Sequence, residues 1–162
     1  MVEISKTITL KLIFLISIIA LASAFFIEYF LGHQPCNLCI LERIPYLLAL
    51  IIIVLNYKFI NLEKYFILSL ILIFLAATIL SLYHLGIEQG FIEESTVCIM
   101  KNTSDIISKE ELLKQLQVMT VSCKDVTFRI FGFSLTAFNM IISLILVIFL
   151  TSFFKNYEKF KK

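Results

Sequence analysis

The stretch Tyr65–Ile87, YFILSLILIFLAATILSLYHLGI, contains no Asp, Glu, Lys or Arg. A helix needs about 20 predominantly apolar residues to cross the hydrocarbon core of a bilayer, and this stretch is long enough. Three further uncharged stretches lie elsewhere along the chain, at Leu12–Ile27, Ile44–Tyr57 and Ile130–Phe154. The sequence therefore predicts four membrane-spanning helices.

The composition agrees with this prediction. The 162 residues are 60% hydrophobic and 16% charged, whereas soluble domains average roughly 45–50% apolar and about 25% charged residues. Short links make consecutive spans antiparallel neighbours, so we expect an all-α membrane protein, a single-domain, up-down bundle of four transmembrane helices. The expected helices lie near 9–30, 40–57, 65–86 and 132–154, and two outer loops near 31–39 and 87–131. The net charge of +2 gives no signal of nucleic-acid binding.

Basic residues predict the orientation, because Lys and Arg are enriched in cytoplasmic loops. If the N-terminus is cytoplasmic, that side carries Lys6, Lys11, Lys58, Lys64, Lys155, Lys159, Lys161 and Lys162. Most basic residues of the other side lie in the long loop near 87–131, among many acidic residues. We therefore expect both termini in the cytoplasm and all four cysteines outside. Ala22–Ala24 imitates a signal-peptide cleavage site, but the apolar run continues to Phe30, so we expect this segment to remain as a helix.

The second uncharged stretch carries extra information because it is short. Ile44–Tyr57 must reach back through Arg43 toward Cys39 to cross a bilayer. Arg43 and Cys39 are therefore expected at membrane depth. They are four residues apart, so a helix that begins near Cys39 would place them one turn apart on one face, where the guanidinium favours a thiolate. The alternative is that Arg43 anchors the helix at the headgroups. Glu42 is expected to be a solvated interfacial charge.

Cys36 and Cys39 form a CxxC pair just outside this helix. Closing so small a ring restrains little of the unfolded chain, so the pair is a poor structural staple and favours exchange chemistry. A zinc half-site and a buried inert pair are the other interpretations.

Cys98 and Cys123 lie in the long loop. As a plain structural bridge they would add about 3 to 4 kcal/mol by chain-entropy arithmetic. Beside a CxxC on the same membrane face, exchange with that pair is the favoured interpretation. Four cysteines allow three pairings, and the residues alone do not choose among them.

His84 lies near the outer end of the predicted helix 65–86. An ionisable residue at membrane depth is a functional candidate, and a hydrogen-bonded interfacial histidine is the alternative. Tyr46 is expected to belong to the aromatic belt and the packing. Within the long loop, Ser108–Glu111 is typical of a capping box and predicts a helix that lies on the bilayer or packs on the loop.

Three segments together resemble a known family, the bacterial disulfide bond formation protein B (DsbB) family of inner-membrane thiol:quinone oxidoreductases. They are Pro35–Arg43, Tyr83–Gly90 and Cys123–Leu135, and with four spans in the same order the resemblance covers essentially the whole chain. Phe128 stands where many relatives have Trp. That departure touches no cysteine and concerns partner fit rather than chemistry.

The resemblance implies a route for electrons. A periplasmic, thioredoxin-fold oxidase of the DsbA type would attack a disulfide between Cys98 and Cys123, and Cys98 would form the transient mixed disulfide. Electrons would then pass to Cys36 and Cys39, with a bridge between Cys36 and Cys123 as one route.

The resemblance also implies the acceptor and the location. Cys39 would deliver the electrons to a quinone, ubiquinone or menaquinone, held near Arg43 and His84. The protein would lie in the bacterial inner membrane, with the cysteine loops in the periplasm.

Two other functions remain open at this point. A membrane metal-binding or transport protein would use Cys36, Cys39, Cys98 and Cys123 as thiolate ligands, although such ligands would be oxidised in this compartment and no polar ladder crosses the spans. A structural membrane protein would use the cysteines only as staples.

Overall fold

The computed structural model describes residues 2–59, 62–94, 98, 122–124, 128–130 and 132–161. Five helices are present in this part of the chain, α1 (Val2–Tyr29), α2 (Asn37–Leu41), α3 (Ile44–Lys58), α4 (Glu63–Glu88) and α6 (Leu135–Lys161). With α2 and α3 taken as one span, four segments are long and apolar enough to cross a membrane, Thr7–Tyr29, Asn37–Lys58, Glu63–Glu88 and Leu135–Asn156. The prediction of a four-helix membrane protein is confirmed. The expected helix at Ser108–Glu111 lies outside the described residues.

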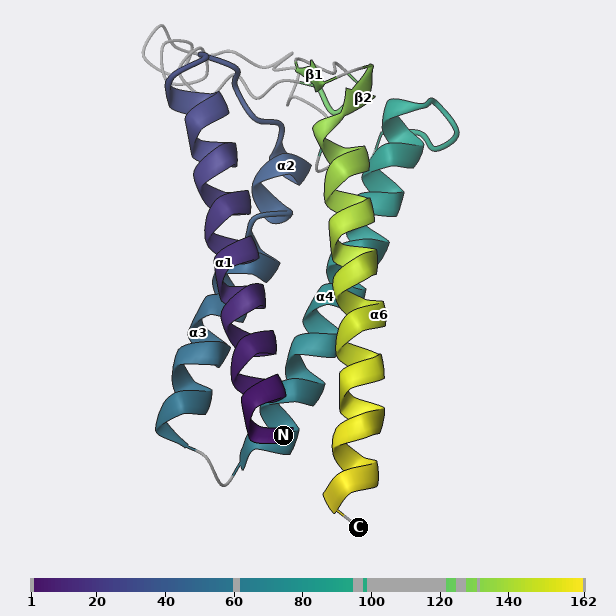
Figure 1. Cartoon of the computed structure of the whole chain (residues 1–162). Helices are drawn as coiled ribbons and strands as arrows, with labels where there is room; N and C mark the ends of the chain where they lie inside the picture. Colours follow the sequence, from purple (N-terminus) through teal and green to yellow (C-terminus); the bar gives the residue numbers. More distant parts are fainter. Residues whose placement is uncertain are drawn as a thin grey trace, which may run out of the picture.

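The four spans stand side by side, with neighbours in sequence packed against each other (Figure 1). α1 packs on α3, α3 on α4, and α4 most extensively on α6, whereas α1 and α6 meet at few points. Both ends of the chain lie at the lower end of the bundle in Figure 1, and α2 and the strands lie toward the other end. The bundle is therefore least closed between α1 and α6.

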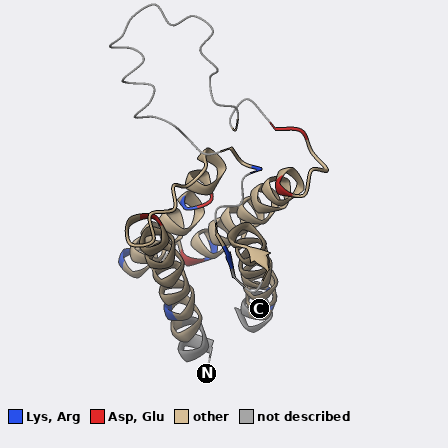
Figure 2. Cartoon of the chain, turned by 90° about the horizontal axis from the view of Figure 1, so that it is seen from above, with Lys and Arg blue, Asp and Glu red and all other residues tan. Residues whose placement is uncertain are grey.

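A continuous apolar core holds the spans together. Its fully buried side chains come from all four helices and include Leu10, Ile13, Ile53, Ile67, Phe74 and Leu150. Many other large apolar side chains are exposed on the outside of the helices, among them Ile19, Ile51, Leu72 and Ile145. Seen from above, charged residues occupy few positions along the spans (Figure 2). An exterior this apolar suits a hydrocarbon solvent rather than water.

The second span is broken between α2 and α3, where a single helix near 40–57 was expected. Pro45 lies in the first turn of α3. A proline ring collides with the carbonyl of the residue four positions earlier, here Leu41, and a helix cannot continue through that point. α2 accordingly ends at Leu41, and Glu42 and Arg43 occupy the break.

The last span also begins differently from the expectation of a helix near 132–154. Arg129–Ile130 (β1) and Phe133–Ser134 (β2) form a short antiparallel pair in which Arg129 lies opposite Ser134. Gly132 in the turn has φ +86°, a left-handed conformation that glycine adopts without a steric penalty. The helix α6 therefore starts only at Leu135.

Candidate functional site

All four cysteines lie in one cluster. Cys98 and Cys123 form a disulfide with a Cα–Cα distance of 5.4 Å, and Cys36 and Cys39 are free thiols. Cys36, Cys98 and Cys123 are buried together with Leu38 and Ile87, and Cys39, Leu80 and Tyr83 pack against them. The structure therefore places a dithiol beside a disulfide, the arrangement that thiol–disulfide exchange requires.

The same bridge bears on the metal-binding interpretation. Two of the four sulfur atoms are bonded to each other in Cys98–Cys123. A metal is bound by deprotonated thiolates, so these two residues have no ligand to offer in this state. The arrangement does not favour a site built from all four cysteines.

Contacts from the residues after α4 and from the first loop hold the residues near Cys123. Glu94, just beyond α4, accepts hydrogen bonds from the Ser122 hydroxyl and, at 3.1 Å, from the backbone N–H of Lys124. His33 in the first loop lies against Phe128, with 5.3 Å between ring centroids. These contacts tie the segment around Cys123 to the end of α4 and to the first loop.

Cys36, rather than Cys39, occupies the helix N-terminus. It is the N-cap of α2, and its Sγ accepts a hydrogen bond of 3.2 Å from the backbone N–H of Cys39. The sequence interpretation expected the helix to begin near Cys39 and to favour a thiolate there. Hydrogen bonds from the Cys39 side chain and from His84 lower the pKa of Cys36 to about 5, although burial acts in the opposite direction.

We predict that reduced Cys36 remains a thiolate in mildly acidic solution. In a Cys98→Ala/Cys123→Ala variant, which leaves only the CxxC thiols, the thiolate absorbance near 240 nm should persist on acidification and fall with a midpoint near pH 5. His84→Ala removes a hydrogen-bond donor and should raise that midpoint by about one pH unit or more. The matched control is His33→Ala, since His33 lies in the first loop, where its ring contacts Phe128. A midpoint that is the same with and without His84 would contradict the assignment.

His84 is buried beside the CxxC pair. Its side chain is 1% exposed, Nε2 lies 3.5 Å from Cys36 Sγ, and Nδ1 lies 2.8 Å from Glu42 Oε1. Thr136 Oγ1 is 3.3 Å from the same Nδ1. The ring therefore connects the thiol of Cys36 to the carboxylate of Glu42.

One sequence-based expectation is wrong in this region. Glu42 is 8% exposed rather than solvated, because the break after α2 turns it inward, where Asn139 Nδ2 donates to its Oε2 at 2.8 Å. Tyr46 belongs to the packing, as expected, but lies in the buried core rather than in an aromatic belt, and its hydroxyl donates to Asn139 Oδ1 at 2.5 Å. Asn139 itself was missed, although an amide in the middle of an apolar span signals a buried partner.

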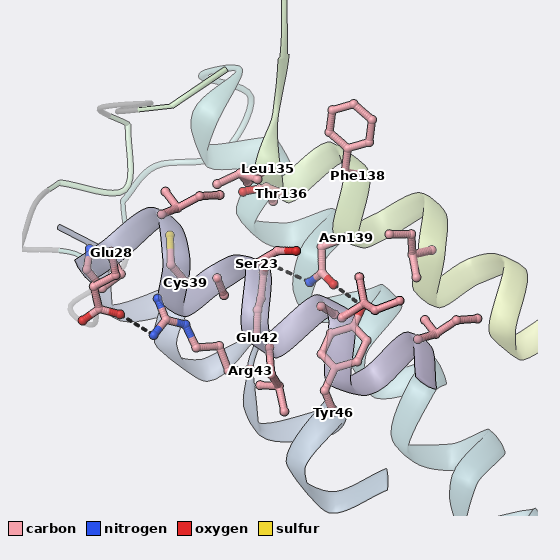
Figure 3. Close-up of a pocket in the computed structure, with 18 of the residues that line it drawn as sticks. Ser23, Glu28, Cys39, Glu42, Arg43, Tyr46, Leu135, Thr136, Phe138 and Asn139 are labelled. Carbon is pink, nitrogen blue, oxygen red and sulfur yellow. Dashed lines mark hydrogen bonds and ion pairs between the residues drawn. The ribbon is translucent and has the colours of Figure 1, made fainter. Parts of the chain in front are cut away.

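A cavity of about 630 Å³ lies between α1 and α6, where the bundle is least closed. Most of its wall is apolar, from Ile16, Ile19, Ala20, Ala24, Ile27, Leu135, Phe138, Ile142 and Leu146. Its polar groups include Cys39, Glu42, Arg43 and Asn139, which Figure 3 shows near one another. Ligand sites combine a largely apolar wall with a few polar groups in this way, at volumes of roughly 300–1,000 Å³.

Arg43 belongs to this cavity and does not extend into solvent. Its side chain is 15% exposed, its Nη1 is 2.5 Å from Glu28 Oε2, and its guanidinium lies 5.1 Å from the ring centroid of Phe25. Cys39 and Arg43 both line the cavity, as the predicted juxtaposition requires, although the helix between them is broken. His84 is not among the lining residues.

The fold and the site together define the class of this protein. It is a membrane-spanning helix bundle that carries a dithiol next to a disulfide. A family model described as "Disulfide bond formation protein DsbB" matches residues 6–153. The chain belongs to this family, which confirms the resemblance seen in the sequence.

A curated relative also matches this chain over most of its length. The "Uncharacterized protein RP370" of Rickettsia prowazekii (strain Madrid E) is 33% identical over 147 residues, which cover 90% of this chain and 85% of the relative. No solved structure matches this chain. The family makes the chain a disulfide bond formation protein.

Proposed function

We propose that this protein is a thiol:quinone oxidoreductase that reoxidises a periplasmic DsbA-like dithiol oxidase and so drives disulfide bond formation. One observation carries the proposal. The buried cluster that contains the Cys98–Cys123 disulfide also contains the CxxC pair, and Cys39 of that pair lines the apolar cavity between α1 and α6. A single connected site thus joins a disulfide to a cavity that opens among membrane-spanning helices.

In the proposed reaction, electrons enter through the long loop. A thiolate of the reduced partner attacks Cys98, which forms a mixed disulfide and releases the Cys123 thiolate. The second partner thiolate then resolves the mixed disulfide, so the partner leaves oxidised and Cys98 and Cys123 are reduced. Exchange with an oxidised Cys36–Cys39 pair restores the loop disulfide and leaves the dithiol seen in this structure.

The cavity fits an isoprenoid quinone, ubiquinone or menaquinone, in chemical character. The apolar wall suits a lipid-soluble molecule, and Arg43 offers hydrogen-bond donors at the polar end beside Cys39. When bound, a quinone supplies an acceptor for two electrons and two protons. Arg43 would hold the head group and favour negative charge on it, and Cys39 would face it.

This proposal gives His84 a different role from the one that the resemblance implied. It was expected to hold the quinone, but its ring contacts Cys36 and Glu42. We therefore place its action on the CxxC pair.

The proposed location is the bacterial inner membrane, with both termini in the cytoplasm and the cysteine cluster at the periplasmic end. The basic residues near the ends of the spans support this orientation. An oxidising periplasm is also the compartment in which a Cys98–Cys123 bridge persists.

The test is to trap the partner. In Cys123→Ser, the free Cys98 thiolate attacks the disulfide of an oxidised partner, and no Cys123 thiol remains to displace the bound partner, so a mixed disulfide should accumulate in non-reducing gels of membranes. We predict that Cys98 carries a thioredoxin-fold protein with a CxxC dithiol, identified by mass spectrometry of the released band. Cys98→Ser/Cys123→Ser is the matched control and should trap nothing. A Cys98 adduct that contains no such protein would refute the proposed partner.

A further inference from the structure

A chain of short contacts runs from the thiol of Cys36 to the cavity. Cys36 Sγ lies 3.5 Å from His84 Nε2, and His84 Nδ1 lies 2.8 Å from Glu42 Oε1. Glu42 in turn lines the cavity. All three side chains are buried, so solvent does not compete for the proton along this chain.

We infer that His84 and Glu42 carry a proton from Cys36 to the cavity while the CxxC pair is oxidised. The inference rests on the proposed function and adds the path of the protons, which that proposal does not describe. In the reduced pair Cys39 carries an S–H proton, and the proton of Cys36 resides on His84 Nε2, which donates to the Cys36 thiolate. Oxidation to a disulfide forms one S–S bond, breaks the S–H bond of Cys39 and releases two electrons and these two protons. Reducing a quinone to a quinol consumes the same two electrons and two protons, in two new O–H bonds. Cys39 lines the cavity and gives its proton there directly. His84, which holds the Cys36 proton at Nε2, gives up the proton at Nδ1 to Glu42, which delivers it at the cavity wall.

The carboxylate of Glu42 is held for this role. Its Oε2 accepts a hydrogen bond of 2.8 Å from Asn139 Nδ2, which also donates to Ser81 Oγ at 2.8 Å. The hydroxyl of Tyr46 fixes the other end of the Asn139 amide. Oε1 is thereby directed toward His84, the geometry that a proton transfer needs.

Other groups near His84 are less suited to the transfer. Glu88 Oε1 lies 3.8 Å from His84 Nε2, accepts a hydrogen bond of 2.6 Å from Thr136, and is not among the residues that line the cavity. Thr136 lines the cavity, but its hydroxyl lies 3.3 Å from His84 Nδ1 and donates a hydrogen bond to Glu88. The other charged groups of the wall, Glu28 and Arg43, are paired with each other. Glu42 is the acid that contacts both His84 and the cavity.

The experiment compares Glu42→Gln with its matched control Glu88→Gln in the full-length protein. Both substitutions neutralise a carboxyl group near His84 and keep its size. Reduction of a short-chain quinone by the pre-reduced protein is followed in single turnover, in H2O and in D2O. We expect Glu42→Gln to slow quinol formation about 100-fold, the scale of lost general acid–base catalysis, and to enlarge the solvent isotope effect. Glu88→Gln should stay within about threefold of the unsubstituted protein.

A second readout needs no quinone. In quinone-free protein with the Cys98→Ala/Cys123→Ala background, the thiolate absorbance of Cys36 is titrated. Because Glu42→Gln removes the carboxylate that faces His84 Nδ1, the midpoint should rise by about one pH unit, and Glu88→Gln should move it less. A carboxyl group with only a packing role would leave this midpoint unchanged.

The outcomes separate this inference from the proposed function. If the unsubstituted protein does not reduce quinone, the proposed function fails. If it does, and Glu42→Gln is equally fast, the proton leaves by another route and the inference is overturned. If only Glu88→Gln slows the reaction, the transfer runs through Glu88, and the inference is also overturned.

Discussion

Cys39→Ser is expected to abolish catalytic quinone reduction by a reduced DsbA-like partner, with a loss of more than about 1,000-fold, the scale seen when a nucleophile is removed. The reason is positional. Cys39 is the cysteine that lines the cavity, whereas Cys36 is buried behind it against His84. A serine hydroxyl neither forms a disulfide nor donates electrons, so the connection between the sulfur cluster and the cavity is lost.

The measurement can show where the reaction stops. Cys39→Ser retains Cys98 and Cys123, and the purified variant is first oxidised chemically so that it carries the Cys98–Cys123 disulfide. The variant should therefore oxidise about one equivalent of the partner in a single burst and then stop, with no quinol formed. Cys36→Ser is expected to stop at the same stage, because the CxxC disulfide needs both sulfurs. Continued turnover in both variants would contradict the proposed route.

Arg43→Ala is expected to raise the KM for quinone by roughly 10- to 100-fold, which corresponds to about 1.4 to 2.8 kcal/mol of binding. Arg43 supplies the cationic side chain of the cavity wall, and its guanidinium is held by Glu28 and by the ring of Phe25. Its removal takes away a donor to the head group and leaves the Glu28 carboxylate without this partner.

Two variants separate these effects. Arg43→Ala/Glu28→Gln removes the unpaired carboxylate, so a KM that stays high in this double variant reports the lost donor itself. Lys58→Ala is the matched control, since it removes an exposed positive charge at the other end of α3 and should leave KM unchanged. Thermal unfolding of each variant identifies a general loss of stability. An unaltered KM in Arg43→Ala would mean that Arg43 does not hold the head group.

Several features of the fold could be predicted from local sequence. The four spans follow from uncharged stretches such as Tyr65–Ile87, because a bilayer accepts a backbone only when the segment is apolar and helical. The break before α3 was missed although Pro45 signals it, since hydropathy does not register backbone sterics. The late start of α6 at Leu135 was missed because two-residue strands leave no periodic pattern.

Part of the site could likewise be predicted from the sequence, and part could not. Cys36, Cys39 and Arg43 lie close together in sequence, so their neighbourhood could be predicted, and the resemblance alone suggested Cys98 and Cys123 as exchange partners, which stays a proposal. The contacts of His84 with Cys36 and Glu42 span 48 and 42 residues of sequence. No local pattern specifies contacts at such separations.

The sequence by itself determined the class of this protein, a four-span membrane helix bundle with a CxxC pair at the end of a short apolar stretch. Those properties depend on residue type and spacing along the chain. The tertiary structure alone decided that Cys36 takes the helix N-cap, that Glu42 turns inward to His84, and that α1 and α6 leave a cavity beside Cys39. Each of these follows from how separate helices pack, and packing depends on shapes that meet only after the spans assemble.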